Sequence, residues 1–296
     1  MNINRYRIYR HSISSWFPPV DFEREQDTIP SLSLTEAMIK KNVGSSFATS
    51  CFLSGGVDSS LLAAILKPDT AYVAVFEDDK YNEVKFARKV ADDIGFNLKE
   101  VLITRNSYTS TMEYLIRRKQ DGLHPNEPCL YLVAKQMKKD GHISVISGEG
   151  ADDIFGGYSD LLLNEDKYMK DKKTLFNRYS YTKDPKLLKH FNYVPNMERF
   201  ILEYHTPGLI QRAENACGCA GVKVNFPYLS GELPQLMWEA KPEFKREKSL
   251  LKQIAIKYLP DEIVYRQKVG FPIPVEEWFG GIENFLKFNV EIWKSL

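Results

Sequence analysis

The chain has 296 residues, 43% of them hydrophobic, which suffices for one large domain or two small ones with a packed core. The 40 Lys and Arg residues nearly balance 39 Asp and Glu residues, and the net charge of +1 excludes a broad field that would recruit nucleic acid or an anionic membrane. The 4 cysteines are too few for a disulfide framework, and no apolar run approaches the ~20 residues of a spanning helix. We therefore expect a cytoplasmic protein with no membrane or nucleic-acid partner.

The predicted elements begin after an N-terminal segment, residues 1–30, which has no clear hydrophobic period and is typical of a linker. Apolar runs predict strands over 48–53, 71–76, 98–103 and 143–146. Helical patterns lie between them, over 61–66, 86–94, 112–116 and 130–137, and Gly95 ends the second of these. Strands that alternate with helices predict right-handed crossovers and a mostly parallel sheet.

The second half of the chain has a different pattern. Beyond residue 158 we find helical and charged segments but no strand, and residues 167–173 indicate a solvated turn or a loose connection. We predict one domain over 31–296, with an α/β core over 31–158. A mainly helical lobe over 159–296 would pack on the edge of the sheet.

The first chemical motif follows the first strand and consists of Ser54, Gly55, Gly56, Asp58, Ser59 and Ser60. Two glycines allow a sharp turn and a close approach to a ligand. The helix that begins behind them offers free N–H groups and a partial positive charge, which together favour phosphate. Asp58 could hold a magnesium ion against the phosphate oxygens. The alternative is a Ser/Gly-rich turn between a strand and a helix.

Two further blocks accompany this motif. Ser147, Gly148 and Glu149 follow the fourth strand, and Asp152 comes three residues later. Ligands of parallel sheets bind beyond the carboxyl ends of the strands, so both glycine motifs should face one crevice. The third block runs from Arg266 through residue 274.

The first motif resembles the pyrophosphate loop of the ATP pyrophosphatases. The three blocks in this order resemble the synthetase domain of glutamine-dependent asparagine synthetase and its β-lactam-forming relatives, over about residues 32–278. The resemblance implies a doubly wound, HUP-like α/β fold with a parallel sheet, and it implies ATP and Mg²⁺ as cofactors.

The resemblance also implies roles for individual residues. Asp58 and Asp152 would hold magnesium, Lys268 would neutralise charge on the α-phosphate and the leaving pyrophosphate, and Arg266 is a weaker candidate for the same phosphates. Glu149 would accept a proton from the attacking ammonia or orient it. Adenine would lie near Leu53, Ala74 and Val75, with Ser147 and Gly148 nearby. The alternatives are helix capping for the acids, a surface position for Lys268 and a turn carboxylate for Glu149.

The N-terminus lacks a feature of the glutamine-using enzymes. Their glutaminase domain exposes a cysteine directly after the initiator Met, whereas Asn2 stands here. We therefore expect the nitrogen to come from free ammonia, from another amine donor, or from a separate glutaminase subunit.

Several acceptor-side residues depart from the family pattern. Lys223 stands where Glu is expected, Asn225 where Arg is expected, and His124 opens a segment that replaces the usual Asp-Pro-Ser run. Asn82 replaces an Asp after the second strand. We predict that Lys223 faces a small-molecule carboxylate other than free aspartate; the alternative is that it points to solvent.

These observations lead to an ATP-dependent amide-forming ligase that adenylates a specialised carboxylate, such as a polysaccharide sugar acid or a natural-product intermediate. An ammonia-dependent asparagine synthetase is the second hypothesis. An RNA thiolation enzyme would need a cysteine in the crevice, whereas Cys51 and Cys129 lie in apolar segments typical of core thiols. A non-catalytic, ATP-binding subunit is the remaining alternative.

Overall fold

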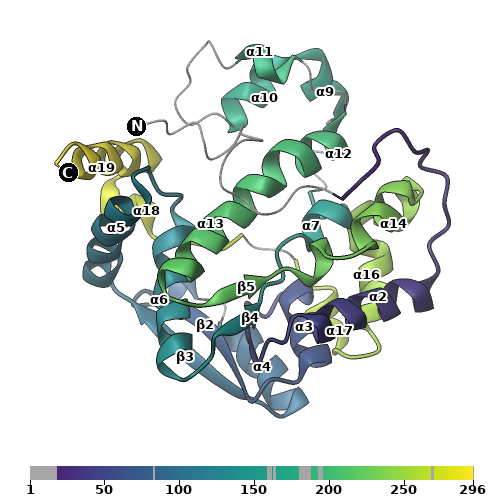
Figure 1. Ribbon diagram of the computed structural model, residues 1–296, viewed down its shortest axis with the longest axis horizontal. Coiled ribbons are helices and arrows are strands. Elements are labelled where there is room, and N and C mark those ends of the chain that lie inside the picture. The colour runs from purple at the N-terminus through teal and green to yellow at the C-terminus, as the bar shows by residue number, and fades with distance from the viewer. Residues whose placement is uncertain are drawn as a thin grey trace.

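A computed structural model of the chain describes residues 19–82, 84–158, 162, 165–179, 188–192, 196–267 and 270–295 (Figure 1). Residues 1–18 and Lys268 lie outside this description. The linker-like character of residues 1–18 and the role of Lys268 therefore stay predictions.

The centre of the fold is a sheet of five parallel strands in the order β3-β2-β1-β4-β5. The strands are β1 (Ser50–Phe52), β2 (Thr70–Phe76), β3 (Asn97–Ile103), β4 (Ser144–Ile146) and β5 (Lys223–Asn225). The four strands predicted from the sequence and their parallel pairing are confirmed. The prediction that no strand follows residue 158 is wrong, because β5 pairs with β4. Its three residues carry no apolar run, and only the pairing with β4 defines it as a strand.

The crossover helices cover both faces of the sheet. They are α3 (Val57–Leu66), α4 (Val84–Ile94), α5 (Arg105–Lys119) and α6 (Asn126–Lys139), preceded by α2 (Leu32–Ser45) and with the short η1 (Asp79–Tyr81) after β2. Helix α3 connects β1 to β2, and helix α4 connects β2 to β3, so these strands are added outward from β1 in one direction. The chain then returns through α5 and α6 to β4 on the other side of β1. Right-handed crossovers in opposite directions place the two helix pairs on opposite faces.

This strand order creates a switch point between β1 and β4. The connection after β1 leads toward β2, and the strand that precedes α7 (Ala151–Ile154) is β4, on the other side of β1. Loops that leave neighbouring strands in opposite directions open a crevice at the carboxyl edge of the sheet. Both glycine motifs lie at this edge.

The second half of the chain shares the main core with the first. Buried side chains of α13, α14 and α16 pack in the same cluster as Leu61 and Leu62 of α3. The helices α9–α12 have a small core of their own and stand above the sheet in Figure 1. Residues 167–173 form the end of α9 and the start of α10, which meet at the exposed, non-helical Asp171, so the predicted turn or connection is limited to that residue. Tyr168 of α9 is buried in the small core.

The second-half elements before β5 are α9 (Glu165–Lys170), α10 (Lys172–Tyr179), α11 (Leu188–Phe191), α12 (Met197–Phe200), the π-helical η3 (Ile201–His205) and α13 (Thr206–Cys219). Those after it are η4 (Pro227–Leu229), α14 (Leu233–Glu239), α15 (Pro242–Lys245), η5 (Arg246–Lys248), α16 (Ser249–Ala255), α17 (Asp261–Val264), α18 (Val275–Phe279) and α19 (Ile282–Lys294).

Both ends of the described chain are tied to the domain. Phe22 packs edge-on against Trp238 with ring centroids 4.9 Å apart, and Thr28 forms a parallel bridge with Ala240. At the other end, α19 packs beside α5 (Figure 1), and the buried amide of Asn289 accepts a hydrogen bond from the Leu123 N–H. No helix within the described ranges is long and apolar enough to cross a membrane.

Candidate active site

The loop after β1 forms the first wall of the site. Gly55 has a φ of +73°, and a Cβ atom there would lie 2.6 Å from the backbone nitrogen of Ala87, so only glycine fits. The hydroxyls of Ser54 and Ser59 lie 3.0 Å apart across the turn, and the Gly56 N–H donates to Ser54 Oγ. The first turn of α3 leaves N–H groups without intrahelical acceptors. The loop therefore suits an anion such as phosphate.

The loop after β4 touches the first loop. A Cβ atom on Gly148 would lie 2.9 Å from the backbone nitrogen of Ser59, so the missing side chain allows the two loops to meet. Ser147 Oγ accepts a hydrogen bond from the Glu149 N–H at 3.3 Å. Gly150 then begins α7 with a φ of +94°. The two glycine motifs thus lie against each other at the carboxyl edge of the sheet.

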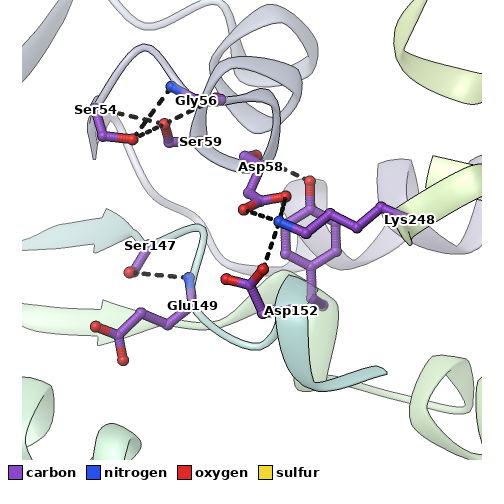
Figure 2. A network of polar contacts seen from close by, with 9 residues as sticks. Ser54, Gly56, Asp58, Ser59, Ser147, Glu149, Asp152 and Lys248 are labelled. Carbon is purple, nitrogen blue, oxygen red and sulfur yellow. Dashed lines mark hydrogen bonds and ion pairs between the residues drawn. The ribbon is translucent and has the colours of Figure 1, made fainter. Parts of the chain in front are cut away.

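Asp58 and Asp152 converge on one lysine that the sequence did not single out (Figure 2). The Lys248 ammonium lies 2.8 Å and 2.6 Å from the two carboxylate oxygens of Asp58, and 2.6 Å from Asp152 Oδ1. The Lys248 side chain is only 7% exposed. Burial by itself would lower the pKa of Lys248, but the two carboxylates outweigh this effect and raise that pKa above its usual value.

The backbone around Lys248 explains its position. Glu247 and Lys248 both adopt left-handed conformations, with φ of 52° and 62°. The Lys248 N–H donates to the carbonyl of Phe155 at 3.0 Å, which anchors the segment to the end of α7. A Cβ atom on Gly157 would lie 2.5 Å from Lys248 Cε and would overlap Asp152 Oδ1. The glycine thus makes room for the ion pair.

The two carboxylates suit a magnesium ion that also takes phosphate oxygens. Their oxygens lie no more than 5.2 Å apart, since one of each lies 2.6 Å from the same nitrogen. Ligand oxygens of one magnesium ion lie up to about 4.2 Å apart, because each bond is about 2.1 Å. Among the described residues, no three His, Cys, Asp or Glu side chains form a metal site alone. A bound cation would therefore depend on oxygens from water or substrate.

Glu149 points away from this ion pair and toward Arg212 of α13. Arg212 Nη2 donates to Glu149 Oε1 at 2.7 Å, and Nη1 lies 3.3 Å from Nδ1 of His124. Burial opposes the charge of Arg212, but the attraction of Glu149 outweighs it and raises the pKa of the guanidinium. Glu149 Oε2 is buried without a hydrogen-bond partner within the described part of the chain.

The remaining predicted residues divide between the crevice and the core. The Arg266 guanidinium lies 4.3 Å from the ring centroid of Phe86, and its Nη2 would be 3.8 Å from a Cβ on Gly56, so it reaches the glycine loop. Ser60 is fully buried and Leu53 is 2% exposed, so both side chains lie in the core below the loop. The half-buried Ala74 and Val75 lie at the carboxyl end of β2, as the adenine prediction requires.

The structure explains three departures from the family pattern. Lys223 is exposed at the amino end of β5, away from the crevice edge, so the structure gives no support to its predicted contact with the acceptor. The Asn225 amide donates to Ser144 Oγ and to the Val145 carbonyl, which makes it a structural residue. Asn82 pairs with both the N–H and the carbonyl of Phe76, and a carboxylate lacks the donor for the second bond.

Sequence reasoning missed Lys248 and Arg212. Lys248 lies in a charged stretch, residues 245–248, that looks like any solvated helix surface. No local signal predicts its left-handed backbone. Arg212 did have a signal, because it is four residues before Ala216 on the buried face of α13. An arginine at a core-facing helical position indicates a buried partner.

A parallel sheet with a glycine loop and paired acids at its switch point is typical of a nucleotide-binding α/β protein. The family model described as Asparagine synthase matches residues 32–289, and the chain belongs to this family. The glutamine-hydrolyzing asparagine synthetase 1 of Bacillus subtilis (strain 168) is 24% identical over 88% of this chain, and the enzyme of Sandersonia aurantiaca is 25% identical over 96%.

The chain spans about half the length of these relatives, 52% of the first and 56% of the second. Among solved structures, the U34-tRNA thiolase NcsA from Methanococcus maripaludis is similar over 89% of this chain and 77% of its own, with 15% identity and a TM-score of 0.39. That score is low, so this likeness indicates no function.

Proposed function

We propose that the chain is an ATP-dependent amide-forming ligase that adenylates a carboxylate, releases pyrophosphate and transfers ammonia or an amine to the acyl-adenylate. The observation that carries this proposal is the convergence of Asp58 and Asp152 beside the glycine loop. Two acids that only capped their helices would have no reason to meet at one point. Membership of the asparagine synthase family supports the same chemistry.

In the first step, a carboxylate oxygen attacks the α-phosphorus of ATP, and the bond to the bridging oxygen of the leaving pyrophosphate breaks. The N–H groups at the start of α3 and the Arg266 guanidinium would bind the polyphosphate. Asp58 and Asp152 would hold magnesium, which supplies charge neutralisation. Lys268 would add positive charge as the pyrophosphate leaves.

In the second step, the nitrogen nucleophile attacks the acyl carbon, AMP leaves and the nitrogen loses a proton. Glu149 is suited to take this proton, because Arg212 fixes one carboxylate oxygen while the other, Oε2, is buried and accepts no hydrogen bond from the described residues. Glu149 acts on the nitrogen, and Arg212 positions it.

The acceptor is proposed to be a specialised carboxylate rather than free aspartate. Lys223 is exposed away from the crevice edge and Asn225 bonds to β4, so the support comes from His124, which belongs to a segment that departs from the family and lies against Arg212. The second candidate, ammonia-dependent asparagine synthesis, is favoured by the family match.

The test is pyrophosphate release across a panel of carboxylates, with Mg²⁺ and either ammonium or amines. Release should require an acceptor and should be lost in Asp58→Asn and Asp152→Asn. Asp92→Asn, which changes an exposed acid of α4, is the control and should keep full activity. Efficient asparagine formation would favour the second candidate. If neither aspartate nor any other carboxylate supports pyrophosphate release, the remaining hypothesis is a non-catalytic, ATP-binding subunit.

Thiolation is disfavoured by three of the four cysteines, and burial also raises the pKa of the fourth, the half-buried Cys219. Cys51, Cys129 and Cys217 are buried, and burial raises the pKa of the Cys51 thiol to about 12. A buried thiol with a raised pKa is a poor nucleophile.

A further inference from the structure

Lys248 already contacts both of the carboxylates that a shared cation would need. Its ammonium nitrogen lies 2.6 Å from an oxygen of each carboxylate (Figure 2). A metal ion about 2.1 Å from those same oxygens could lie no more than about 4.7 Å from the nitrogen, since that is the sum of the two distances. The lysine and a divalent cation would therefore repel each other and compete for the two carboxylates.

The position of Lys248 is fixed by tertiary structure. Its side chain passes over Gly157, its backbone N–H is bound by the Phe155 carbonyl, and its φ of 62° is left-handed. The ammonium is buried, and each of the two carboxylates remains largely shielded from water, with exposures of 20% and 18%. A displaced ammonium would stay near the site and would need new oxygen partners, because a buried charge without partners is costly.

A polyphosphate bound at the glycine loop would supply those oxygens. We infer that Lys248 competes with the divalent cation for Asp58 and Asp152, so that the cation binds the pair strongly only together with a nucleoside triphosphate. This inference rests on the proposed function, in which the acids hold magnesium. Lys248 would thus keep free magnesium from the two carboxylates and would couple binding of the cation to binding of the nucleoside triphosphate. Each of the two ligands would strengthen binding of the other by the same factor.

The experiment is a titration of the full chain with Mn²⁺ and no nucleotide, followed by the electron paramagnetic resonance signal of the free ion. Wild type should bind weakly. Lys248→Met should bind ~10-fold more tightly or better, because the competing charge is gone. Mn²⁺ should also raise the melting temperature of Lys248→Met but leave that of wild type nearly unchanged. Lys248→Arg, which keeps the charge, should behave like wild type.

Two controls locate the effect. Lys245→Met removes an equally buried lysine that pairs with Glu198 instead, and it should not increase Mn²⁺ affinity. Adding Asp58→Asn to Lys248→Met should abolish the gain. Equal affinity of wild type and Lys248→Met, or a gain that survives Asp58→Asn, would overturn the inference. If Lys248→Met fails to fold, tight nucleotide-free binding by wild type would still overturn it. None of these readouts depends on catalysis, so failure of the proposed ligase activity would be seen separately.

Discussion

Gly157→Ala should damage the ion pair without removing any charged group. The new Cβ atom would lie 2.5 Å from Lys248 Cε and would overlap Asp152 Oδ1. Reaching an ordinary contact of 3.4 Å requires Lys248 Cε to retreat by 0.9 Å, and Asp152 must rotate away. Overpacking of this kind costs about 1–3 kcal/mol, and a misplacement near 1 Å in an active site can reduce the rate about 10²-fold.

The assay has two parts. Urea denaturation should report a loss of about 1–3 kcal/mol in the free energy of unfolding. Pyrophosphate release should fall by about 10-fold or more. Gly218→Ala is the matched control, because nothing lies within 4 Å of a Cβ atom at that position in α13. It should leave activity unchanged. A Gly157→Ala protein with wild-type stability and turnover would refute the packing of Lys248 and Asp152 over this glycine.

Lys268→Ala should lower kcat by about 10²–10³-fold with little change in the KM for ATP, since its charge contact matters most in the transition state. Steady-state kinetics would measure both constants, and a raised KM with an unchanged kcat would contradict this role. Arg212→Met should retain ATP–pyrophosphate exchange yet lose amide formation, because Glu149 loses its positioning partner; equal losses in both assays would contradict this role. Glu36→Gln should destabilise the fold by about 1 kcal/mol at pH 7. Hydrogen bonds led by that from Lys257 lower the pKa of Glu36 to about 2, so the difference in unfolding free energy should shrink as the pH falls from about 4.5 toward 2. A difference that stays constant down to pH 3 would show that the carboxylate charge is irrelevant.

The sequence by itself determined the elements whose signal is local. Strands β1, β2 and β4 lie within largely apolar runs, β3 ends in one, and α4 has a clear apolar stripe that Gly95 ends with a φ of +88°. The glycine loop was also predictable, because two glycines after an apolar strand permit the positive φ that Gly55 adopts. Sheet rules then sufficed to bring Asp58 and Asp152 to one edge.

Only the tertiary structure decided what depends on contacts between distant segments. The three residues of β5 form a strand because β4 offers an open edge, and nothing in their composition requires it. Asn225 and Lys223 looked like changes in an acceptor pocket, yet one bonds to β4 and the other is exposed. Lys248 is 190 residues from Asp58, and its left-handed backbone is set by its surroundings. A lysine on the surface and a lysine between two carboxylates have the same local sequence pattern, because the difference lies in the partners that folding brings to it.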